Sequence, residues 1–238
     1  MAVNERRLEI PPGSERFIAL QRTAYQHPVN LLFRALRLGT FYDSRFLPWI
    51  ESRRSPVLQE KYAADLRRDY DSIRSALPES ARKILDIGAG ISGIDLFLYQ
   101  HYGSSVDLYL LDKEEVARNI YYGYKSRGAF YNSLELARDF LTTNGVAPRH
   151  IHPLDIVRDG FPSDQRFDLV ISLISWGYHY PIAAYASEVD NALVSGGTLI
   201  VDTRRGTSAK DELQALFGRA SRVLLQTTKF ERVVVHKP

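Results

Sequence analysis

The chain has 238 residues, of which 45% are hydrophobic and 25% are charged, and it carries a formal net charge of +3. These values are typical of a soluble globular protein and exclude collagen-like, low-complexity and wholly disordered chains. There is no cysteine, which excludes disulfides, thiolate zinc sites and cysteine nucleophiles. Residues 1–10 show no apolar signal segment, and no apolar run approaches the about 18 residues of a membrane span. We therefore expect a cytoplasmic protein with no membrane partner.

The positive charge is concentrated at the start of the chain. Residues 1–80 contain 13 Lys and Arg against 10 Asp and Glu, whereas residues 81–238 contain 18 of each kind. A basic segment can attract an anionic substrate or a nucleic acid. Acidic residues are interleaved throughout, however, and this pattern favours a solvated helical surface over a nucleic-acid arm.

The sequence pattern divides the chain near residue 80. Up to that point it is helical, and the longest predicted helix begins at Ser55-Pro56 and ends before Pro78. From residue 83, short apolar runs alternate with turns and helical stretches, as in βαβ units with a parallel sheet. We therefore predict a helical N-terminal segment, residues 1–80, that covers the substrate, and an α/β domain over residues 81–238.

The α/β domain should contain strands near 83–88, 106–112, 150–155, 167–172 and 197–203. Two further runs, 222–228 and 230–236, are too close together for a parallel crossover and should form an antiparallel hairpin. In the long stretch before the third strand, Asn132 and Glu135 have the spacing of a capping box for a helix that ends near Asn144-Gly145.

A glycine-rich turn follows the first predicted strand. Gly88, Gly90 and Gly93 fit the pattern G-x-G-x-x-G, with Ala89 between the first two. Glycines allow a tight turn and a close approach of a ligand to the backbone. About twenty residues later the second strand ends in Asp112, where a carboxylate can accept hydrogen bonds from ribose hydroxyls. Together the two signals predict a cofactor that contains a ribose.

The charge of Asp86 indicates which of two cofactor classes the glycine turn would bind. Asp86 lies two residues before the first glycine, where a carboxylate would repel the pyrophosphate of a dinucleotide but attract an ammonium group. The D-x-G-x-G arrangement of Asp86, Gly88 and Gly90 resembles the first motif of class I S-adenosylmethionine-dependent methyltransferases. Ser92 departs from this motif, because the family often has its third glycine there.

The resemblance continues along residues 80–238 and implies a Rossmann-like seven-stranded mixed sheet with its last strand antiparallel and helices on both faces. It implies that Asp112 holds the ribose and that Asp155 supplies a carboxylate for the adenine amino group. The run ending in Ser172 is similar to the fourth strand of the family, and Ser195-Gly196-Gly197 is similar to the turn into the fifth. The implied cofactor site contains Asp86, Gly88, Ala89, Gly90, Asp112, Lys113, Asp155, Ile156 and Ser172.

The carboxyl ends of the strands are where ligands bind in open α/β sheets, so residues 172–181 should form the reaction edge. His179 is the candidate general base, and Tyr178 or Tyr180 would orient the acceptor. Trp176 would stack on a ring or cover the sulfonium. Packing in the core is the alternative for each of these residues. Further candidate substrate contacts lie in the N-terminal segment: Tyr25, His27, Phe41, Tyr42 and Arg45.

No metal site is predicted. His150 and His152 alternate along a strand without an evident third ligand, and Asp202 at the end of the fifth strand is a single carboxylate. The chain also lacks the N-P-P-Y type of motif with which methyltransferases hold an exocyclic base amine.

These features predict a methyltransferase that uses S-adenosyl-L-methionine and acts on a hydroxyl or amine of a small molecule. Three alternatives stay open: an RNA methyltransferase, an NAD-dependent oxidoreductase, and a non-catalytic nucleotide-binding module.

Overall fold

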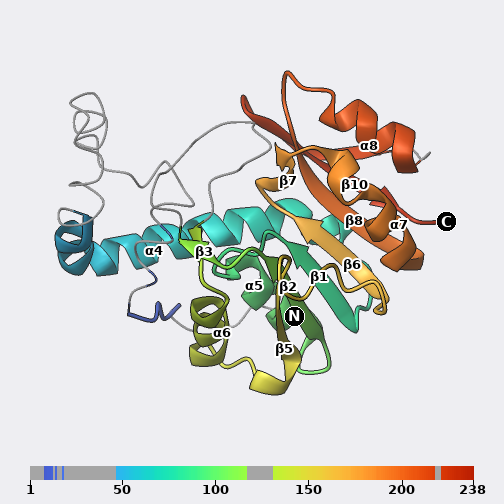
Figure 1. The fold of residues 1–238 in the computed structure, drawn as a ribbon. Coiled ribbons are helices and arrows are strands. Elements are labelled where there is room, and N and C mark those ends of the chain that lie inside the picture. Colours follow the sequence, from blue (N-terminus) through green and yellow to red (C-terminus); the bar gives the residue numbers. More distant parts are fainter. Residues whose placement is uncertain (1–7, 13, 15–17, 19–46, 117–130, 218–220) are drawn as a thin grey trace.

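A seven-stranded sheet forms the centre of the protein (Figure 1). The computed structural model describes residues 8–12, 14, 18, 47–116, 131–217 and 221–238. The strands are β1 (Lys83–Ile87), β2 (Asp107–Asp112), β5 (Ile151–Asp155), β6 (Phe167–Ser172), β8 (Leu193–Arg204), β9 (Arg222–Gln226) and β10 (Phe230–His236). Their order is β5-β2-β1-β6-β8-β10-β9, and β10 runs antiparallel to both β8 and β9. The predicted mixed sheet is confirmed.

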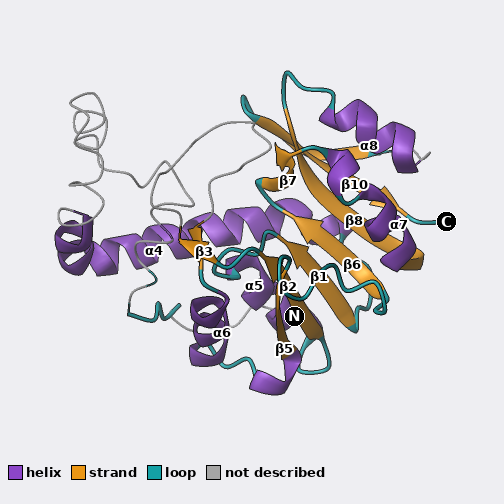
Figure 2. Cartoon of the chain, in the orientation of Figure 1, coloured by secondary structure: helices purple, strands orange, loops and turns teal. Residues whose placement is uncertain are grey.

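Helices cover both faces of this sheet (Figure 2). One face packs against α4 (Leu47–Ile73), α5 (Gly93–Tyr102) and α6 (Leu134–Thr143), and the other against α7 (Ala186–Ala192) and α8 (Ala209–Phe217). Alternate strand residues supply the two cores. Ile84 and Leu108 belong to the first core, whereas Leu85 and Leu111 belong to the second. This alternation is the period of two expected of strands that are buried on both sides.

The described residues also form short helices and strands outside the main sheet. Three 3-10 helices, η3 (Arg74–Ala76), η4 (Pro148–His150) and η5 (Ile182–Ala184), precede β1, β5 and α7. The strands β3 (Glu115–Val116) and β4 (Tyr131–Asn132) pair with each other outside the main sheet, and β7 (Ser175–Tyr180) follows β6. Within the described residues, no helix is long and apolar enough to cross a bilayer.

The start of the longest helix differs from the prediction. The α4 helix already runs at Leu47 and continues through Pro56. A proline inside a helix lacks the N–H donor and crowds the preceding turn. The helix is anchored further along by Tyr62, Leu66 and Tyr70, which lie in the first core. The end is as predicted: Leu77, before Pro78, is extended.

Two other local predictions need correction. Ser195-Gly196-Gly197 lies inside β8 rather than before it, and Gly196, at φ +77°, sits where the pairing of β8 with β6 shifts register. The backbone groups of Gly196 and Gly197 are paired with Lys237, which extends the strand through the glycines. The capping residue of α6 is Ser133, not Asn132, because the Ser133 hydroxyl accepts the Leu136 N–H.

Candidate functional site

The turn between β1 and α5 brings the predicted glycines to the carboxyl end of the sheet. Gly88 and Gly90 both have positive φ, at +79° and +59°, a conformation that glycine adopts without strain. The Gly88 N–H donates to the Leu111 carbonyl of β2 at 2.7 Å. Gly93 begins α5, and a Cβ there would overlap the Tyr62 hydroxyl and the Leu66 side chain of α4. The third glycine therefore allows two helices to pack closely.

Asp112 connects this turn to the end of β2. Its Oδ2 accepts the Gly90 N–H at 2.9 Å, and its Oδ1 accepts the Lys113 N–H at 2.7 Å. Burial raises the pKa of Asp112 to about 6, although these two backbone donors oppose the rise. Each carboxylate oxygen still has a free lone pair for a ligand hydroxyl. The structure thus places the predicted ribose carboxylate directly against the glycine turn.

Two buried carboxyl groups flank the glycine turn, and one of them, Asp86, is close enough to Asp112 to feel its charge. Asp86 on β1 and Asp95 in the first turn of α5 are 3% and 0% exposed. Burial is the main cause that raises the pKa of both, to about 7 for Asp95, and the neighbouring Asp95 raises that of Asp86 further. Hydrogen bonding to the neighbouring Asp86 and Ser92 side chains opposes the rise in the pKa of Asp95. Asp95 was not predicted from the sequence, although its signal was a lone charge within the apolar run 94–98.

Asp155 lies beside Asp112 in the paired strands β5 and β2. Its Oδ1 accepts the Val157 N–H at 3.0 Å, and its own N–H donates to Asp159 Oδ2 at 2.9 Å. The Ile156 N–H donates to the Asp112 carbonyl at 2.9 Å. Asp155 therefore shapes the turn after β5 while its carboxylate stays at the carboxyl edge.

Ser172 holds the ends of two strands together. Its fully buried hydroxyl donates to the Ile87 carbonyl at 2.7 Å and accepts the Trp176 N–H at 2.9 Å. The Trp176 ring is also fully buried, in the core with α7 and α8, and its Nε1 donates to the Ile182 carbonyl. The predicted stacking role of Trp176 is therefore corrected: in the structure its ring is a core residue.

The remaining reaction-edge residues lie on β7. The rings of Tyr178 and His179 contact each other edge to face at a centroid distance of 4.9 Å, and the guanidinium of Arg204 from the end of β8 lies 5.2 Å from the Tyr178 ring centre. Burial, and then the charge of Arg204, lower the pKa of His179 below its ordinary value. At neutral pH this imidazole is uncharged and able to accept a proton. Tyr180 packs against the core with α7 and α8.

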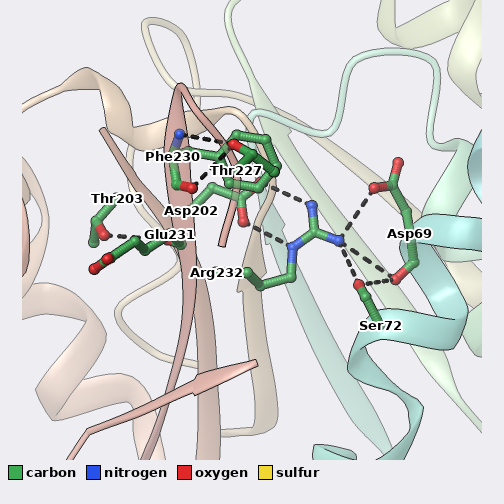
Figure 3. A network of polar contacts seen from close by, with 8 residues as sticks. All are labelled: Asp69, Ser72, Asp202, Thr203, Thr227, Phe230, Glu231 and Arg232. Carbon is green, nitrogen blue, oxygen red and sulfur yellow. Dashed lines mark hydrogen bonds and ion pairs between the residues drawn. The ribbon is translucent and has the colours of Figure 1, made fainter. Parts of the chain in front are cut away.

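A buried ionic network joins β8, β10 and α4 near the candidate reaction edge (Figure 3). Arg232 of β10 donates to both carboxylate oxygens of Asp202 on β8, at 2.7 and 2.8 Å, and reaches α4 at Ser72 Oγ and Asp69 Oδ1, at 2.7 and 3.1 Å. The Ile174 backbone donates to Asp202 and opposes the rise in its pKa that burial causes. Ile174 has φ +57°, which is a strained conformation for a β-branched residue. The network thus helps to fix the segment that leads into β7.

Several predicted features fall elsewhere. Tyr25, His27, Phe41, Tyr42 and Arg45 lie outside the described residues. His150 and His152 lie beside Asp107 at the opposite edge of the sheet, with nitrogen-to-oxygen distances of 2.9 and 3.5 Å. Within the parts of the chain that the structure describes, no group of three His, Asp or Glu side chains has the geometry of a metal site.

Replacing Gly88 with alanine should disturb the turn in two ways. The positive φ should cost about 1–2 kcal/mol, and the new Cβ would overlap the Cβ and Oγ of Ser175, which should cost about 1–3 kcal/mol more. Gly103→Ala is the matched control, because Gly103 has φ +81° but a Cβ there would meet no atom within 4 Å. Urea unfolding should show that Gly88→Ala loses more stability than Gly103→Ala. Adding Ser175→Gly should recover the difference, and no recovery would contradict the proposed overlap.

Comparisons with solved structures place this arrangement in a known fold. No protein-family model matches the chain, and no curated protein is similar to it in sequence. A Nostoc punctiforme protein provisionally assigned as an O-methyltransferase superposes with a TM-score of 0.53 at 16% identity, over 74% of this chain and 56% of that one. A T. thermophilus 16S rRNA N2 methyltransferase, solved with AdoMet and guanosine, superposes with a TM-score of 0.51 at 15% identity, over 74% of this chain and 43% of that one. A Pyrococcus furiosus methyltransferase superposes with a TM-score of 0.52 at 12% identity, over 72% of this chain and 82% of that one.

The chain thus spans only about half the length of the first two of these proteins, at 56% and 43%. At such identities the likeness shows the fold, which is the Rossmann-like fold of class I S-adenosylmethionine-dependent methyltransferases.

Proposed function

We propose that this protein is an S-adenosylmethionine-dependent methyltransferase that methylates a hydroxyl or amine of a small molecule. The observation that carries the proposal is the grouping of Asp86, Asp95 and Asp112 around the glycine turn. A cationic ligand would stabilise the ionised form of these buried carboxyl groups and offset the rise in their pKa, whereas the negative charge of a pyrophosphate would oppose their ionisation. The cofactor has an ammonium group, a sulfonium and a ribose, and therefore suits this set of residues, whereas NAD does not.

Each part of the cofactor has a candidate partner in the chain. Asp112 would accept hydrogen bonds from the ribose hydroxyls, and Asp86 would attract the ammonium group. The backbone of Gly88, Ala89 and Gly90 would face the cofactor, and the missing side chain of Gly88 makes room for Ser175. Lys113, Asp155 and Ile156 lie where β2 and β5 end side by side, which suits the adenine end. Ser172 would act indirectly, by joining β1 to β6.

Methyl transfer requires little from the protein beyond alignment of the acceptor with the methyl group. The cofactor supplies an electrophilic methyl group, which an acceptor oxygen or nitrogen attacks while the carbon–sulfur electron pair stays on sulfur. The chain would hold the acceptor in line and exclude water. His179 would accept the acceptor's proton, and Tyr178 and Tyr180 would orient it. Asp202 takes no part in this step, because Arg232 already occupies both of its carboxylate oxygens.

An RNA acceptor is the second candidate, because one protein of similar fold methylates 16S rRNA. An RNA-binding enzyme would bind RNA in a strongly salt-dependent way. Binding of the cofactor without turnover on either class of acceptor would instead favour a non-catalytic module. A radiolabelled-methyl assay with extracted small molecules and extracted RNA as separate acceptors distinguishes the three outcomes.

Calorimetry with S-adenosylhomocysteine and with NAD tests the cofactor assignment. We expect binding of the first and none of the second. Asp112→Asn should weaken S-adenosylhomocysteine binding by about 1–3 kcal/mol, because charge-assisted hydrogen bonds to the ribose are lost. Asp139→Asn is the control, since Asp139 is exposed on α6. Binding should also weaken as the pH falls through about 6, where Asp112 takes up a proton. Tight NAD binding, or an unchanged affinity in a folded Asp112→Asn variant, would contradict the assignment.

A further inference from the structure

Arg204 stands at the carboxyl end of β8, beside the candidate reaction edge. Its guanidinium lies 5.2 Å from the centre of the Tyr178 ring, and Tyr178 in turn contacts His179. The charge of Arg204 is felt at His179, where it opposes protonation of the imidazole. A fixed cation is therefore placed next to the residue that we propose as general base.

The surroundings of Arg204 differ from those of the other arginines. Among the arginines whose burial the structure describes, only Arg204 and Arg232 are not exposed. Arg232 donates to Asp202, Asp69 and Ser72. In the described part of the chain, by contrast, the Arg204 side chain has no hydrogen bond or ion pair, and its guanidinium lies over the Tyr178 ring. A partly buried charge without a counter-ion is unfavourable, and an anion would relieve that cost.

We propose that Arg204 binds a carboxylate of the acceptor and thereby holds the acceptor's hydroxyl or amine at His179. This inference rests on the proposed function, because it assigns Arg204 to the acceptor side of that site. It narrows the substrate class to small carboxylic acids that also carry a methylatable hydroxyl or amine.

The geometry favours a carboxylate over a phosphate. Arg204 Cζ lies over the Tyr178 ring, and in the described residues no acceptor takes the N–H donors of the guanidinium. A planar fork of donors matches the two oxygens of a carboxylate. A phosphate would bring up to two negative charges, and the next basic side chain, Arg205, is directed to the Thr227 carbonyl at 3.0 Å. One available guanidinium therefore suits a single negative charge.

The test uses benzoate as the probe and the His179 imidazole as the reporter. Histidine-labelled protein is titrated with benzoate and with the neutral isostere benzamide, and the His179 NMR signal is assigned from its loss in His179→Gln. Benzoate should shift this signal saturably and raise the pKa of His179, because it offsets the charge of Arg204. Benzamide should do neither. Arg204→Gln should weaken the benzoate response by about tenfold or more, whereas Arg205→Gln should leave it unchanged.

Three results would overturn the proposal: no response of His179 to benzoate, an equal response in Arg204→Gln, or a stronger response to phosphate than to benzoate. The last would assign the site to a phosphate. Each titration is run with and without S-adenosylhomocysteine, whose binding is measured separately. A benzoate response in a protein that binds no S-adenosylhomocysteine would contradict the methyltransferase function and leave the anion site standing, so the two failures are distinguishable.

Discussion

Replacing Arg232 with methionine should lower the free energy of unfolding by about 3–5 kcal/mol. The Arg232 and Asp202 side chains are 1% and 0% exposed. Removing the guanidinium leaves the Asp202 carboxylate buried without its counter-charge, and it also breaks the hydrogen bonds to Asp69 and Ser72 on α4. Equilibrium urea unfolding of the variant and the parent protein measures the difference.

Two further variants separate the ion pair from the packing around it. Arg232→Met combined with Asp202→Leu should regain much of the lost stability, because no uncompensated charge remains in the core. Asp69→Asn should cost less than Arg232→Met, since the Asp69 side chain is 20% exposed and an asparagine oxygen can still accept the Arg232 N–H. A loss below about 1 kcal/mol for Arg232→Met would show that water reaches Asp202 and that the network is not a buried one.

Replacing His179 with glutamine should lower turnover by about 10²–10⁴-fold, which is the usual contribution of general-base assistance. The affinity for S-adenosylhomocysteine should change little, because the carboxylates of the turn lie on β1, β2 and α5 and not on β7. His236→Gln is the matched control, since His236 is exposed on β10. A near-normal rate in His179→Gln would leave this residue with positioning alone and would make Tyr178 the next residue to test.

The pH profile distinguishes a base from a packing residue. A base must be neutral, so the wild-type rate should fall as the pH drops through the pKa of His179. Burial and Arg204 both lower that pKa from its ordinary value of 6.5, and the acidic limb should therefore lie below pH 6.5. This limb should disappear in His179→Gln, whereas a structural histidine would alter the rate at every pH equally.

Much of the fold was predictable because local signals and the tertiary structure agree. Strands such as Phe167–Ser172 are short apolar runs bounded by turn residues, and the glycine turn combines Gly88 and Gly90 with the strand-end Asp112. Such signals lie within about twenty residues and need no knowledge of distant contacts. The proximity of Asp112 to the turn, seen in its bond to the Gly90 N–H, follows from the parallel pairing of β1 and β2.

The errors arose where distant packing outweighs a local preference. Proline normally begins a helix or stops it, yet α4 continues through Pro56. Glycines usually mark a turn, yet Gly196 and Gly197 are held in β8 by Lys237. Trp176 lies in a run of polar and aromatic residues that suggests a binding surface, but the ring enters the core beside α7 and α8.

The Arg232 network was also beyond sequence reasoning. Its members Asp69, Asp202 and Arg232 belong to α4, β8 and β10, and Arg232 lies 163 residues after Asp69. Any of several carboxylates is a possible partner for an arginine in a strand. Only the folded arrangement, in which β10 pairs with β8 and α4 lies over that face, selects these residues.

The position of β10 also has a consequence for synthesis on the ribosome. Although it follows every other strand of the sheet in the chain, β10 lies between β8 and β9 rather than at an edge. Until residues 230–236 leave the exit tunnel, β8 therefore exposes an unpaired edge and Asp202 lacks Arg232. Exposed strand edges are open to wrong pairing with other chains. The nascent chain can assemble β1, β2, β5 and β6 first, whereas the sheet can close around β10, and Arg232 can reach Asp69 and Ser72 of α4, only after β10 has emerged.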